Sequence, residues 1–239
     1  MRTPDYFLWK GVDSRSMGVH VIKYPPIMRA PERLKFVTVP GRSGDLTISE
    51  GEDDYPVYDA YTRSMEVANM KGADINMARA WLSGTGPLIV GNENGFVYTV
   101  TMQAQLQLDK LMRGVWGGTL QMHTQPLKKK TVQPDDIIIT ESGTMIFNPG
   151  DVHAEPVVRL FAGSTSSATL TIGGKTLSFS SMTEITVIDL ENQWIFDGNG
   201  ARVQNIAEGK FGKIPPGKSI VNFSGSITKV EIVPKWRWR

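Results

Sequence analysis

The sequence contains no cysteine among its 239 residues, so disulfides, catalytic thiolates and thiolate metal sites are excluded. It also lacks any apolar run near the ~20 residues that a membrane-spanning helix needs. The formal net charge is only +2, too small to indicate nucleic acid or an anionic membrane as a partner. The stretch after Met1 has no apolar core of the kind found in secretory signals. We therefore expect a soluble protein with no nucleic-acid or membrane partner.

The residues that usually carry enzyme chemistry are few and do not form a known spacing. His20, His123 and His153 lie far apart, and no serine sits in a G-x-S-x-G elbow. Asp189 and Glu191 are close, but they fall at a strand end and in a turn, where acidic residues serve the turn itself. We expect no enzyme activity, no catalytic residue, no metal site and no cofactor.

The C-terminal half, from about residue 147 to residue 238, has the pattern of many short strands. Ala168, Leu170 and Ile172 alternate with polar residues, which places them on one face of a strand. The pair Gly173-Gly174 follows, and its freedom to adopt positive φ suits a tight hairpin. The pattern predicts an antiparallel β-sandwich of jelly-roll type.

The N-terminal half reads as strands with one helix. Asp74 can cap a helix over residues 74–82, which Gly84 and Pro87 terminate. Prolines and lysines between residues 126 and 136 predict a linker. The predicted fold is mainly β, with two β-sandwich domains: residues 1–130, which include the helix, and residues 131–239.

Residues 96–108 form the cleanest periodic segment, with strict alternation of apolar and polar side chains. This alternation predicts one long strand with a wet face. Residues 119–124 supply a plausible partner strand.

Exposed aromatic rings on β-sandwiches can stack on sugars, and Trp194 and Phe196 are candidates for such a glycan contact. The alternative is that alternating aromatic residues face the core. The terminal Trp236-Arg237 pair suits a closing edge strand or a subunit contact, because Trp and Arg often anchor interfaces.

In combination, these segments resemble the distal tail protein family of long-tailed, non-contractile bacteriophages. The resemblance covers nearly the whole chain and rests on the order and spacing of short motifs. These motifs are FLWKGVDS (7–14), VPGRSGDL (39–46), GTGPL (84–88), NPG (148–150), EPVV (155–158), ATLTIGG (168–174), VID (187–189), PGKSI (216–220) and VEIVP (230–234).

The resemblance implies an N-terminal β-sandwich that assembles into a hexameric ring and a galectin-like C-terminal β-sandwich. It implies a structural hub at the virion tail tip, assembled in the host bacterial cytoplasm. The implied partners are the major tail protein, the tape-measure protein and a tail-associated baseplate or fibre protein. The family brings no catalytic residues. A carbohydrate-binding module for attachment to the host cell wall is the alternative function.

A ring of this kind needs subunit contacts, and the polar face of residues 96–108 is a candidate. A Thr/Gln-rich face suits a wet lumen or a contact between subunits. The candidate interface residues are Val97, Thr99, Thr101, Gln103, Gln105, Trp236 and Arg237.

Overall fold

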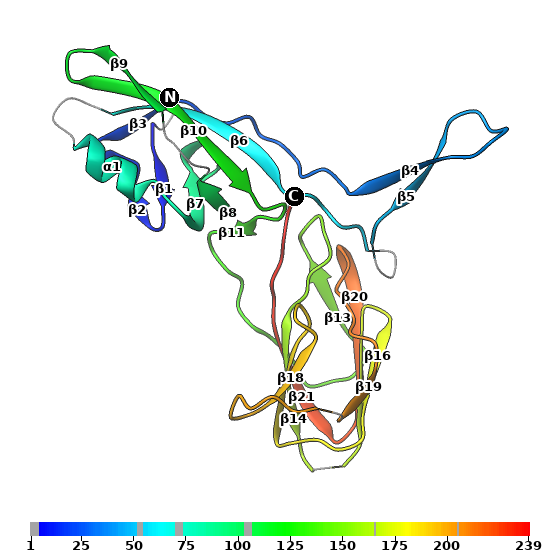
Figure 1. The fold of residues 1–239 in the computed structure, drawn as a ribbon. Helices are drawn as coiled ribbons and strands as arrows, with labels where there is room; N and C mark the ends of the chain where they lie inside the picture. The colour runs from blue at the N-terminus through cyan, green and yellow to red at the C-terminus, as the bar shows by residue number, and fades with distance from the viewer. Residues whose placement is uncertain (1–4, 52–54, 70–73, 103–106, 165, 205) are drawn as a thin grey trace. The chain divides into compact units, whose positions relative to one another are not determined.

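A computed structural model describes residues 5–51, 55–69, 74–102, 107–164, 166–204 and 206–239. The chain divides into two compact units, Met1–Thr131 together with Arg239, and Val132–Trp238 (Figure 1). Both units are built from β-strands, which confirms the predicted mainly-β fold.

The N-terminal unit contains a nine-stranded sheet in the order β2-β1-β7-β8-β10-β6-β3, with β9 beside β10 and β11 beside β8. The residues of this sheet enclose a single apolar core together with α1. Its elements are β1 (Phe7–Trp9), β2 (Val12–Asp13), the 3-10 helix η1 (Ser14–Met17), β3 (Val19–Lys23), β4 (Leu34–Thr38), β5 (Asp45–Ser49), β6 (Tyr61–Asn69), α1 (Ile75–Trp81), β7 (Thr85–Val90), the 3-10 helix η2 (Gly91–Glu93), β8 (Phe96–Met102), β9 (Gln107–Met112), β10 (Val115–Thr124) and β11 (Lys129–Lys130).

Helix α1 forms where the sequence predicts it and is the one α-helix of the described residues. The Asp74 carboxylate accepts hydrogen bonds from the backbone N–H groups of Asn76 and Met77, as an N-cap does. Ala78 is buried against the sheet, and the Trp81 ring stacks on Phe7 with centroids 5.7 Å apart. The helix therefore covers one face of the sheet and closes its core.

The long strand predicted over residues 96–108 includes residues 103–106, which lie outside the described residues. On either side of them the chain forms β8 and β9, both paired with β10 along the same edge. Met102 pairs with Met122 and Gln107 with Thr119, so five steps along this chain match three steps along β10. A regular antiparallel ladder has equal steps on both strands, so the register with β10 shifts by two residues between β8 and β9.

Strands β4 and β5 form a separate two-stranded sheet (Figure 1). Phe36 pairs with Thr47 and Val37 with Leu46 in a regular antiparallel register. Side chains alternate between its two faces, so Leu34 and Phe36 share one face while Val37 lies on the other.

The C-terminal unit is a sandwich of two five-stranded sheets, β12-β21-β14-β17-β18 and β13-β20-β15-β16-β19, with a single apolar core between them. The predicted hairpin at Gly173-Gly174 is confirmed, since Ile172 pairs with Lys175 and both glycines have positive φ. Its strands are β12 (Ile137–Ile139), β13 (Thr144–Asn148), β14 (Val157–Ala162), β15 (Ala168–Ile172), β16 (Lys175–Phe179), β17 (Ile185–Asp189), β18 (Trp194–Asp197), β19 (Ala207–Gly209), β20 (Gly217–Gly225) and β21 (Ile227–Val233).

Candidate assembly surfaces

The face of the nine-stranded sheet that points away from the core is polar. Thr101 of β8 lies level with His123 of β10, which in turn pairs with Thr62 of β6. Two residues along β10, Gln121 pairs with Ser64 on the same face. Hydroxyl, amide and imidazole groups thus extend across three neighbouring strands, a surface suited to water or to a hydrated protein contact.

Three of the proposed interface residues lie on this polar face or at its edge. Thr99 is exposed, while Val97 and Thr101 are half-buried. The Thr101 hydroxyl lies 2.8 Å from that of Thr85 on β7, and Val97 is partly covered because β11 pairs beside it. Gln103 and Gln105 lie outside the described residues, so the extent of this face beyond Met102 is not assigned.

A buried ionic cluster holds two segments of the N-terminal unit to the sheet. The Glu93 carboxylate accepts hydrogen bonds from Arg63 at 3.0 Å and from the Tyr98 hydroxyl at 2.7 Å. The Lys128 ammonium lies 3.5 Å from the same carboxylate, and Arg63 also donates to the carbonyl of Pro26 at 3.2 Å. The Arg63–Glu93 pair therefore holds two segments to the sheet: Arg63 holds the chain that leads to β4, through Pro26, and Glu93 holds the chain that follows β10, through Lys128.

The electrostatics of this cluster favour the charged carboxylate. Burial by itself raises the pKa of Glu93, but the hydrogen bonds from Tyr98 and Arg63 and the positive charges of Arg63 and Lys128 outweigh it. The net result is a Glu93 pKa below its ordinary value. Burial, together with the bond to Glu93, raises the pKa of Tyr98, so its hydroxyl stays protonated and remains a donor.

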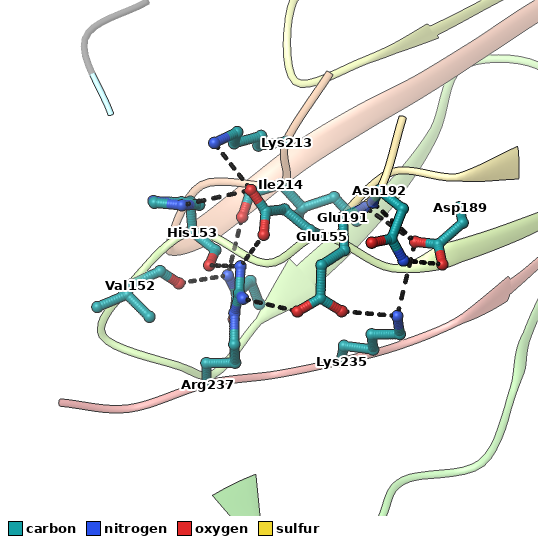
Figure 2. A network of polar contacts seen from close by, with 11 residues as sticks. Val152, His153, Glu155, Asp189, Glu191, Asn192, Lys213, Ile214, Lys235 and Arg237 are labelled. Atoms are coloured by element: carbon teal, nitrogen blue, oxygen red, sulfur yellow. Dashed lines mark hydrogen bonds and ion pairs between the residues drawn. The ribbon is translucent and has the colours of Figure 1, made fainter. Parts of the chain in front are cut away.

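A second cluster, in the C-terminal unit, anchors the final residues of the chain (Figure 2). The Glu155 carboxylate lies 2.6 Å from Arg237 and 2.8 Å from Lys213, and His153 is 3.8 Å away. Burial raises the pKa of Glu155, but the two cations outweigh this effect and hold it below the ordinary value. Burial lowers the pKa of His153 to about 4, with Lys213 and Arg237 adding repulsion, so this imidazole is neutral at pH 7.

The carboxylates considered as a catalytic pair are engaged in structural contacts. Asp189 accepts hydrogen bonds from the backbone of Glu191 and Asn192 and from the Asn192 amide, which stabilises the turn between β17 and β18. Glu191 binds Lys235 at 2.9 Å (Figure 2). Each side chain therefore helps to hold the turn or the C-terminal segment in place.

Trp236 and Arg237, two of the proposed interface residues, face into their own unit. Trp236 is 6% exposed and packs in the sandwich core, so it offers almost no area to another subunit. Arg237 is buried beside Glu155, as described above. Sequence reasoning recognised Trp and Arg as anchoring residues, but it had no signal for the distant Glu155 that receives the guanidinium.

The candidate glycan residues lie on the edge strand β18. Trp194 is 43% exposed, and its ring meets Phe196 edge-on with centroids 6.1 Å apart. The Arg202 guanidinium lies 4.8 Å from the Trp194 centroid, above the ring. A sugar stacking on Trp194 would therefore need the opposite ring face or would displace Arg202.

Two exposed apolar surfaces were missed by sequence reasoning. One is the β4–β5 hairpin, and the other is the outer face of β13 and β20, where Met145, Phe147 and Ile220 are exposed. On β13 and β20 the exposed residues alternate with buried ones, whereas no residue of β4 or β5 is buried, so the sequence pattern alone does not show which apolar faces are covered.

The described residues hold no group of three or more histidine, aspartate or glutamate side chains placed to bind a metal ion. Within the same part of the chain, no helix is long and apolar enough to cross a bilayer.

Comparison with solved structures identifies the fold. The chain superimposes on the Dit protein of phage SPP1, described as a paradigm of the hub adsorption apparatus in phages that infect Gram-positive bacteria, with a TM-score of 0.68 at 13% identity. The match covers 96% of this chain and 98% of the SPP1 protein. This chain has the fold of a phage distal tail protein.

This fold, shared across both units, confirms the family resemblance read from the sequence at the level of structure. A component of the activated phage p2 baseplate also matches over 95% of this chain, with a TM-score of 0.41 and 8% identity. No family model matches the chain, and no curated protein matches its sequence.

Proposed function

We propose that this protein is a structural hub of a long, non-contractile phage tail, placed at the tail tip. The observation that carries the proposal is the near-complete match, over both units, to the SPP1 Dit protein, which is a tail hub. The contacts within the two ionic clusters support the proposal. They hold chain segments in place, and their carboxylates are bound to neighbouring side chains in structural contacts. The protein acts by assembly and not by catalysis.

In this proposal the protein forms a hexameric ring, and the polar sheet face takes part in it. Thr99, Thr101 and Val97 lie where a subunit contact or a water-filled lumen would meet the sheet. The ring would join the major tail protein and the tape-measure protein to a baseplate or fibre protein. Assembly would take place in the bacterial cytoplasm.

The mass of the purified protein in solution tests self-assembly. Light scattering should give six times the chain mass of 26.4 kDa, and negative-stain images of the same sample should show rings. A monomer at every concentration examined would contradict the hexameric ring.

A carbohydrate-binding role is the second candidate, favoured by the exposure of Trp194 beside Phe196. Glycan-array binding by the full-length protein, lost on Trp194→Ala, would support it. The matched control is Trp238→Ala, because Trp238 packs against the sandwich core. Equal loss with both variants would indicate a stability effect and count against a sugar site.

A further inference from the structure

The β4–β5 hairpin carries large apolar side chains that are exposed in the single chain. Phe36 is 63% exposed, and Leu34 beside it on the same face is also exposed. Leu46 and Ile48 are exposed on the opposite face. An isolated two-stranded hairpin is only marginally stable in water. A ribbon that is apolar on both faces therefore calls for a covering surface outside its own sheet.

A second exposed apolar surface lies on the C-terminal unit, at the edge strand β13. Met145 pairs with Ile220 of β20, and Phe147 is the next outward residue. Phe147 is 60% exposed, while the alternate residue Ile146 is buried in the core. The outer face of a sandwich sheet is usually polar, so a group of three large apolar side chains there marks a contact site.

The two surfaces match in three respects. Each presents an aromatic ring, Phe36 or Phe147, beside aliphatic neighbours. Each has an unpaired strand edge, since among the described strands β4 and β5 pair only with one another and β13 pairs only with β20. The charges are opposite: Asp45 shares the Phe36 face, and Lys218 lies directly across from Phe147.

We propose that the Leu34–Phe36 face of the hairpin of one copy packs on the Met145–Phe147–Ile220 surface of a second copy. A second copy is the occupant because one chain carries both halves of the contact. Two different, complementary surfaces on one chain produce head-to-tail contacts, which close into a ring when the rotation permits. This inference rests on the proposed self-assembly and names the contact that joins neighbouring subunits.

The absence of cysteine from the sequence makes cross-linking a clean test. Full-length chains with Phe36→Cys and one affinity tag are co-expressed with chains that carry Phe147→Cys and a different tag. A short bis-maleimide is added after light scattering has established the oligomeric state. Controls replace Phe36→Cys with Lys35→Cys on the opposite face of the hairpin, or Phe147→Cys with Thr176→Cys, which is exposed three strands away.

The expected product is a cross-linked dimer that carries both tags, formed by the Phe36 and Phe147 pair and lost with either control. An oligomer that yields no two-tag product would overturn the inference while leaving the ring in place. A monomer without the product would overturn both. A dimer that joins two Phe36→Cys chains would show instead that hairpins pair with hairpins, and would also overturn it.

Charge reversal provides an independent test of the same contact. Asp45→Lys and Lys218→Asp should each weaken assembly, by roughly fivefold in dissociation constant for one surface ion pair. The double variant should recover the assembly of the unmodified chain. Additive losses in the double variant would contradict the proposed facing of these two surfaces.

Discussion

Arg63 of β6 donates a hydrogen bond to Glu93 of η2 across 3.0 Å, and both side chains are almost fully buried. The same Arg63 guanidinium reaches the carbonyl of Pro26 and stacks over the Tyr98 ring at 4.6 Å. The Lys128 ammonium lies 3.5 Å from the Glu93 carboxylate. The Arg63–Glu93 pair therefore links segments 102 residues apart in the chain, because Arg63 contacts Pro26 and Glu93 contacts Lys128.

Glu93→Gln should destabilise the N-terminal unit strongly. The change leaves Arg63 and Lys128 as buried positive charges without their anion. Removing one partner of a buried ion pair typically costs about 3–5 kcal/mol, and the retained amide oxygen favours the lower end. Urea unfolding measures the loss. Glu66→Gln is the matched control, because its pair with Lys23 is exposed at 3.5 Å and should change stability by less than about 1 kcal/mol.

Stability should fall as the pH drops from 6.5 towards 4, and His153 is the cause. The pKa of His153 is lowered from 6.5 to about 4 in the folded chain. As the pH falls, the imidazole of the unfolded chain therefore binds a proton before that of the folded chain does. The stabilisation is complete above pH 6.5 and is lost as the pH falls through this window. Denaturant midpoints between pH 7 and pH 5 should show a smaller slope for His153→Gln. An unchanged slope would count against a buried neutral imidazole.

Trp236→Ala should destabilise the C-terminal unit by about 3–5 kcal/mol, the usual cost of emptying a large aromatic site in a core. Trp194→Ala, at a partly exposed ring, should cost about 1 kcal/mol or less. The thermal transition of the C-terminal unit compares the two. Equal effects would contradict the assignment of Trp236 to the core.

Gly173→Ala should cost more than Gly174→Ala, although both glycines have positive φ. At Gly174 the added methyl meets open space, so only the backbone penalty of about 1–2 kcal/mol applies. At Gly173 the methyl would collide with the carbonyl of Lys213 as well. Unfolding midpoints of the two variants report the difference, and the reverse order would show that the turn adjusts around residue 173.

Thr99→Lys should disrupt ring assembly without unfolding the chain, because Thr99 is exposed on the polar sheet face. In the proposed hexameric ring this change would place six like charges around the ring and oppose its closure. Light scattering measures the oligomer, and circular dichroism checks the fold. Thr176→Lys, at an exposed strand position of the C-terminal unit, is the control that should assemble normally. Full assembly of Thr99→Lys would remove this face from the interface.

Local chemistry allowed much of the fold to be predicted. The Asp74 cap, the Gly173-Gly174 turn and the alternation of Ala168, Leu170 and Ile172 each depend on neighbours within a few residues. The register shift between β8 and β9 was not predicted, because it is defined by the pairing with β10 and has no signal in the alternation of residues 96–108.

The ionic clusters could not be predicted for a related reason. Glu93 meets Lys128 and Glu155 meets Arg237 across long separations, and neither pair has a local sequence signal. Trp236 illustrates the same limit, since a tryptophan side chain suits an interface and a core equally well. Only the position of the C-terminal segment within its unit shows that Trp236 belongs to the core.

The most direct measurement of the central claim is immunogold labelling of virions from the culture that produces this protein. Antibodies against the purified chain should place gold at one end of the tail, distal to the capsid. Label along the whole tail tube or on the capsid would contradict a hub at the tail tip. Unlabelled tail tips would also contradict it if immunoblots of the denatured virions detect the protein.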